Sequence, residues 1–96
     1  MVKLNSKDDS IYDAFKQVDL MCHEGKFSEL DELLLNLDIN NLAPEISVAW
    51  LMASYPAHEH LPSRSIVVEE FHKHLIEIMS VAEADSICKI LRVKND

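Results

Sequence analysis

Apolar residues recur at three- and four-residue steps along almost all of this 96-residue chain, which places them on one face of an α-helix. No stretch alternates apolar and polar residues for long enough to predict a β-strand. Because independent domains usually run to ~100–150 residues, residues 1–96 form a single domain. We predict an all-α fold, a compact bundle of four to five short helices in antiparallel helical hairpins, with residues 1–8 flexible and residues 93–96 frayed.

Two apolar stripes and the turn between them predict the first hairpin. A helix over about residues 9–24 ends at Gly25, which suits the left-handed conformation, and Ser28 is a natural N-cap for the next helix. The first stripe consists of Ile11, Ala14, Phe15, Val18, Met21 and Cys22, and the second of Leu30, Leu33, Leu34 and Leu37. The short connection predicts an antiparallel pair.

Prolines and a capping pattern divide the rest of the chain. Pro44 suits the first turn of a third helix over about residues 44–54, which is apolar nearly all round and is therefore expected at the centre of the fold. Trp50 is expected to be its largest single burial, and Tyr55–Pro56 ends it. A loop over residues 57–61 then leads to a fourth helix, which begins at Pro62 or Ser63 and whose stripe is Val67, Phe71, His74 or Leu75, and Ile78.

The end of the fourth helix allows two interpretations. Ser80 and Glu83 have the spacing of a capping box, which predicts a fifth helix that starts there. The link between the two helices is almost nil, so the alternative is one long helix whose middle resembles a cap.

Charge and composition exclude several classes of protein. There are 17 acidic and 9 basic residues, a net charge of -8, and direct nucleic-acid binding needs clustered Lys and Arg instead. The chain starts without the apolar run of a signal peptide, and its most apolar window is about half the ~20 residues that span a bilayer. We therefore expect no membrane partner and a cytoplasmic location.

Cys22 and Cys88 are expected to be two buried thiols, with a single disulfide as the alternative.

Motifs that carry catalysis are absent from the sequence. One glycine cannot form a phosphate cradle, and there is no G-x-S-x-G, H-E-x-x-H or C-x-x-C. Cys22 and His23 are adjacent on a helix and so point about 100° apart, which is poor geometry for a thiolate–imidazole couple. We expect no enzyme activity and no cofactor.

Histidines form the one cluster with metal-binding chemistry. His58 and His60 fall in the predicted loop, and His72 and His74 fall on the fourth helix. Zinc accepts His and Glu, so His58, His60 and His72 are the candidate metal ligands. No ligand spacing matches a structural zinc pattern, and the favoured interpretation is no metal site, with these three side chains in water and His74 at the edge of the core.

The acidic excess lies in the first part of the chain. Residues 1–60 hold 11 acidic and 4 basic residues, and so carry 7 of the 8 net negative charges. Asp13, Asp19, Glu29 and Glu32 are expected on a solvated face that keeps the protein soluble. The alternative is a negative face that steers a basic partner or imitates a nucleic acid.

Two stretches resemble known families. Residues 25–30 and 37–41 resemble the turn and the second-helix exit of a tetratricopeptide repeat shortened by about three residues, but a single copy excludes an array, which needs roughly three units. The Gly-x-Phe turn and the later Leu-Pro-x-Arg resemble short uncharacterised all-helical proteins of bacteria and their phages over about residues 14–78. That resemblance rests on Gly25, Phe27, Leu37, Asp38, Leu51, Tyr55, Leu61, Pro62 and Arg64. It implies a small helical cytoplasmic protein and no known activity, and the histidine-rich loop before Leu61 departs from it.

Arg64 stands in the first turn of the fourth helix, where it meets the positive end of the helix dipole. We expect a salt bridge from Arg64 to an acid of the first hairpin, with a partner anion as the alternative.

Our hypothesis is a non-catalytic protein-binding or regulatory protein; the alternatives are a homodimer through the last helix, an acidic nucleic-acid mimic and a histidine-based metal-binding protein. The candidate partner-binding residues are Arg64, Tyr55, Asp13, Asp19, Glu29 and Glu32.

Overall fold

A computed structural model describes residues 7–92 and confirms the all-α fold. In chain order the elements are α1 (Lys7–His23), α2 (Phe27–Leu35), α3 (Pro44–Ser54), the 3-10 helix η1 (Tyr55–His60), α4 (Arg64–Ile78) and α5 (Val81–Leu91). Residues 7 and 8, which we predicted to be flexible, are the first residues of α1. The rest of that prediction, for residues 1–6, and the fraying predicted for residues 93–96 lie outside the described residues. None of the described helices has the length and apolar content needed to cross a bilayer.

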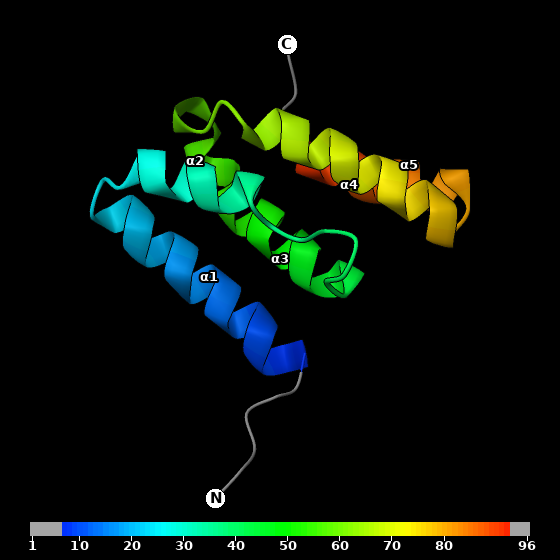
Figure 1. Ribbon diagram of the computed structural model, residues 1–96, viewed down its shortest axis with the longest axis horizontal. Coiled ribbons are helices and arrows are strands. Elements are labelled where there is room, and N and C mark those ends of the chain that lie inside the picture. Colours follow the sequence, from blue (N-terminus) through cyan, green and yellow to red (C-terminus); the bar gives the residue numbers. More distant parts are fainter. Residues whose placement is uncertain (1–6, 93–96) are drawn as a thin grey trace, which may run out of the picture.

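The helices pack with α2 and α3 in the middle of the bundle. α1 lies alongside α3, which is its most extensive helix–helix contact, and α2 packs against both α1 and α4 (Figure 1). α4 and α5 form an antiparallel pair that contacts α3 on its other side. The expected central position of the third helix is therefore confirmed, because it contacts α1, α4 and α5.

The core centres on Phe71, the largest fully buried side chain, rather than on Trp50 as we expected. Trp50 is only partly buried and packs against the outside of the core cluster. α3 buries small residues instead, namely Ser47, Ala49 and Ser54, together with Leu51. Small side chains on the covered faces of α3 allow neighbouring helices to pack close to it, and the Trp50 indole lies at the edge of the core cluster.

Two predicted core positions and one predicted cap are wrong. Phe15 on α1 is 44% exposed and Ile78 at the end of α4 is 51% exposed, because helical spacing defines a stripe but not how wide a face the neighbouring helices cover. α2 begins at Phe27 with Lys26 as its N-cap, so Ser28 lies inside the helix. Gly25 does adopt the left-handed conformation, with φ 73, as predicted.

The capping box at Ser80 decides between one long helix and two. The Ser80 hydroxyl accepts from the backbone N–H of Glu83 at 3.2 Å, and the Glu83 carboxylate accepts from the backbone N–H of Ser80 at 3.4 Å. Met79 before it is fully extended, with φ -152 and ψ 177. α5 therefore starts afresh and folds back along α4.

Both cysteines are free thiols. Cys88 is buried in the core as predicted, whereas Cys22 is only half-buried. Burial raises the pKa of both thiols, and the nearby Asp19 carboxylate raises the pKa of Cys22 further. Neither cysteine is therefore a ready thiolate at neutral pH.

The raised thiol pKa values predict a loss of stability in alkali. Unfolding returns each thiol to an ordinary pKa of about 8.5, so the unfolded chain ionises at a lower pH than the folded chain. The contribution of the protonated thiols to the free energy of unfolding is therefore fully present below the pKa of the unfolded thiols. It is lost as the pH rises from there toward the higher pKa of the folded thiols. Urea unfolding of the reduced protein between pH 7 and pH 10 measures the slope, and Cys88→Ala should flatten it. An unchanged slope in that variant contradicts the assignment.

Replacing Ser80 tests whether the capping box stabilises the fold. Ser80→Ala removes the acceptor of the Glu83 amide and should lower the free energy of unfolding by about 1 kcal/mol. Ser86→Ala, an exposed position within the same helix, is the matched control and should raise stability by a few tenths of a kcal/mol at most. Urea denaturation followed by circular dichroism gives both values, and equal effects would argue that the box contributes nothing.

Candidate functional site

Arg64 is buried, with 3% of its surface exposed, and its guanidinium joins two helices. Its Nε donates to the Ser54 hydroxyl at 2.9 Å, and its Nη2 donates to the Leu51 backbone carbonyl. The Tyr55 ring lies against the guanidinium, with its centroid 5.3 Å from Cζ. The structure thus brings together two predicted site residues, Arg64 and Tyr55.

The expected salt bridge between Arg64 and an acid of the first hairpin is wrong. The guanidinium binds uncharged oxygens in the last turn of α3, near the negative end of the helix dipole. The first hairpin instead supplies Asp31, whose carboxylate accepts the Ser63 backbone N–H at 2.8 Å. Asp31 thereby satisfies an amide at the start of α4, where a negative charge is favourable.

Burial has the largest effect on the pKa of Arg64. It lowers the pKa of the guanidinium, while the nearby Tyr55 hydroxyl acts in the opposite direction. A guanidinium stays protonated at neutral pH because its ordinary pKa exceeds 12. Among residues 7–92, Arg64 is therefore a buried positive charge held by hydrogen bonds and an aromatic face rather than by a counter-ion.

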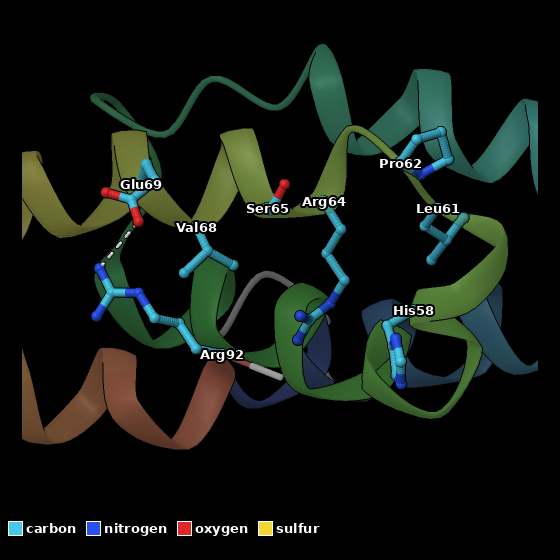
Figure 2. A pocket seen from close by; sticks show the side chains of 8 residues that line it. All are labelled: His58, Leu61, Pro62, Arg64, Ser65, Val68, Glu69 and Arg92. Atoms are coloured by element: carbon cyan, nitrogen blue, oxygen red, sulfur yellow. Dashed lines mark hydrogen bonds and ion pairs between the residues drawn. The ribbon is translucent and has the colours of Figure 1, made fainter. Parts of the chain in front are cut away.

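A cavity of about 360 Å³ lies beside Arg64, between the start of α4, η1 and the end of α5 (Figure 2). We call it the arginine pocket. Its lining consists of His58, Leu61, Pro62, Arg64, Ser65, Val68, Glu69 and Arg92. The chain contains only two arginines, and both line this pocket. Sequence spacing could not bring them together, because Arg64 begins α4 whereas Arg92 directly follows α5.

A chain of polar contacts leads from Arg92 across α4 to α5. Arg92 Nη2 lies 3.3 Å from the Glu69 carboxylate and donates to His72 Nδ1 at 2.7 Å. Because arginine only donates, His72 is the neutral tautomer whose Nε2–H donates to Asp85, also at 2.7 Å. His72 was expected in water, but α5 folds back along α4 and places both partners on it.

The three histidines predicted as candidate metal ligands lie in three separate environments. His60 stacks on Phe27, with ring centroids 4.1 Å apart, and His58 lies at a tilt to Tyr55. His72 uses both ring nitrogens in its contacts with Asp85 and Arg92. Across residues 7–92 the structure shows no group of three or more His, Cys, Asp or Glu placed to hold a metal ion.

The predicted acidic residues Asp13, Asp19, Glu29 and Glu32 are all exposed. They lie on α1 and α2, whereas Arg64 and Tyr55 lie where α3, η1 and α4 meet. The six predicted partner-binding residues therefore do not form one site.

A second hollow, of about 690 Å³, lies between the start of α3 and the α4–α5 pair. We call it the apolar groove. Its lining is mostly aliphatic: Ala43, Pro44, Glu45, Val48, Met52, Leu75, Met79, Ile87, Ile90 and Leu91. Of these, Ile90 is 63% exposed and Met52 is 41% exposed. We predicted exposed apolar residues on the last helix, but not the part of α3 that forms the opposite wall.

Comparison with protein-family models, with curated proteins and with solved structures finds no match to this chain. The two hollows and their chemistry are therefore the grounds for a function.

Removing the Arg64 side chain should destabilise the fold strongly. Arg64→Ala removes a donor from both the Ser54 hydroxyl and the Leu51 carbonyl, leaves them only the hydrogen bond between them, and empties a packed site, so we expect a loss of about 2–4 kcal/mol. Arg92→Ala removes the other arginine, whose ion pair is exposed, and should cost less than about 1 kcal/mol. Chemical denaturation compares the two variants, and similar losses would refute the structural role of Arg64.

Proposed function

We propose that this is a non-catalytic protein-binding module, and that the apolar groove receives an amphipathic helix of a partner protein. The observation that carries the proposal is the groove itself: two of its apolar side chains, Ile90 and Met52, remain exposed after the chain has folded. Contiguous exposed apolar surface costs solvation free energy, and a partner that covers it recovers that free energy. Three helical walls form a trough of the kind that accommodates a helix with anchors on one face.

The side chains of the groove suit a helical ligand. Met52 and Met79 contribute flexible, polarisable thioethers, which adapt to different apolar partners. Met79 and Ile87 also line an adjoining hollow of about 440 Å³, so the groove extends along α5. An extended aliphatic trough provides room for several anchors spaced by helical turns.

Charge indicates a basic partner. Glu45 lies in the groove, and Glu83 lies in the hollow that continues it. The chain as a whole carries a net charge of -8, which attracts cationic partners and repels a second copy of itself. We therefore assign the groove to a partner helix that has an apolar face flanked by Lys or Arg, in preference to a homodimer.

The chemistry of the described residues supports a role without catalysis. Both nitrogens of His72 are engaged, so neither is free to take a proton from a substrate. The Cys22 pKa is raised, which works against a thiolate nucleophile. The remaining features of our hypothesis, a cytoplasmic regulatory role and a bacterial or phage origin, belong to the same proposal.

Binding of a designed peptide tests the groove. The probe is a fluorescent Leu/Lys peptide of about four helical turns with all leucines on one face. We expect Ile90→Glu to weaken binding by about tenfold or more, because it places a charge in the apolar trough. Leu20→Glu on α1 is the matched control, since Leu20 is 53% exposed and lies away from the groove, and it should bind like the wild type.

Two further measurements separate the other candidate functions. A peptide of the same composition without an apolar face should bind weakly, and so should a Leu/Glu peptide. Equal binding by Ile90→Glu and the wild type overturns the proposal, and if a charge reversal at Glu32 abolishes binding instead, the acidic face is the contact. Sedimentation that shows a dimer which Ile90→Glu dissociates would assign the groove to a second copy.

A further inference from the structure

The arginine pocket combines two features that a merely structural arginine does not require. Two of the five N–H donors of the Arg64 guanidinium bind Ser54 and Leu51, and the other three have no hydrogen-bond partner among the described residues. Arg64 is 97% buried, yet within the part of the chain that the structure describes it lines a cavity instead of packing against a counter-ion. A buried positive charge with unused donors is a site that an anion can complete.

The second arginine adds to this positive charge. Figure 2 shows Arg64 reaching the cavity from the start of α4 and Arg92 from the chain directly after α5, with Val68 between them and His58 on the far side of Arg64. Glu69 is the one acidic residue of the lining and pairs with Arg92 at 3.3 Å, on an exposed rim that holds the ion pair weakly. The lining thus carries a formal charge of +1 in a chain of net charge -8, because two arginines exceed one glutamate.

We propose that the arginine pocket binds a small organic oxyanion, a carboxylate or a phosphate ester. Guanidinium groups recognise these groups through paired N–H donors, and Ser65 at the rim offers a hydroxyl. Leu61 and Val68 provide an apolar wall for the rest of the ligand. The volume, about 360 Å³, lies at the small end of ligand pockets, so the ligand has the size of a metabolite rather than that of a polymer.

Glu69 opposes the binding of an anion to the arginine pocket. Its carboxylate lies 3.3 Å from Nη2 of Arg92, where it offsets the positive charge of that guanidinium and repels an entering oxyanion. Removing its charge should therefore strengthen anion binding, whereas removing the charge of Arg92 should weaken it. General attraction of anions would change with the same signs, so a specific site also requires that a charge change remote from the pocket leave the apparent Kd unchanged.

Thermal denaturation tests the site with two probes, inorganic phosphate and sodium benzoate, each measured against sodium chloride at the same ionic strength. We expect at least one probe to raise the Tm of the full chain above the chloride control, because a ligand that binds only the folded state stabilises it. The concentration dependence gives an apparent Kd for each probe. The phosphate and benzoate arms show which oxyanion the pocket prefers.

Two variants with exposed side chains decide the outcome. Arg92→Gln should raise the apparent Kd by about tenfold and Glu69→Gln should lower it by about threefold, each relative to the wild type. Leu20→Glu, remote from the pocket, controls for net charge, since it adds a negative charge elsewhere. If neither probe exceeds the chloride control, or if Arg92→Gln and Glu69→Gln change the Kd in the same direction, the proposal is overturned.

Discussion

The guanidinium of Arg64 joins the first half of the bundle to the second. It donates to Leu51 and Ser54 at the end of α3, while its own backbone begins α4. These hydrogen bonds therefore hold the end of α3 against the start of α4. Asp31 of α2 holds the preceding amide, that of Ser63, from the other side. These hydrogen bonds set the position of α4, and α4 carries Phe71 at the centre of the core.

The second decisive element is the extended residue Met79, with the capping box at Ser80 after it. One uninterrupted helix would carry the last eleven helical residues away from the core, whereas a fresh start folds them back. α5 then supplies Ile87 and Ile90 to the apolar groove, and the chain directly after it supplies Arg92 to the arginine pocket. Both candidate binding sites therefore depend on a reversal formed by two adjacent residues.

Charge in this protein acts over two distances. The net charge of -8 produces a long-range field that favours basic partners and slows the approach of anions. Inside the arginine pocket, hydrogen bonds from guanidinium groups act only at contact distance, and burial strengthens them. A small anion would therefore bind by fit with the donors rather than by long-range attraction, which favours selectivity over speed of association.

The sequence by itself determined the helices and several of their ends. Local chemistry sets these features: Pro44 pre-sets the backbone of a first helical turn, Gly25 tolerates positive φ, and Ser80 with Glu83 satisfies free amides. Only the tertiary structure decided which apolar residues are buried, because the width of the covered face depends on neighbouring helices. Phe15 and Ile78 are exposed and Trp50 is only partly buried for that reason.

Tertiary structure also decided where the charged residues act. The sequence singled out Arg64 as unusual at its position, but its partners are oxygens of α3 rather than acids of the first hairpin, because α3 ends directly beside the start of α4. His72 and Arg92 lie 20 positions apart in the chain and come into contact only when α5 folds back along α4. Contacts of this range depend on how helices pack, and the periodicity of one segment carries no information about the segment that covers it.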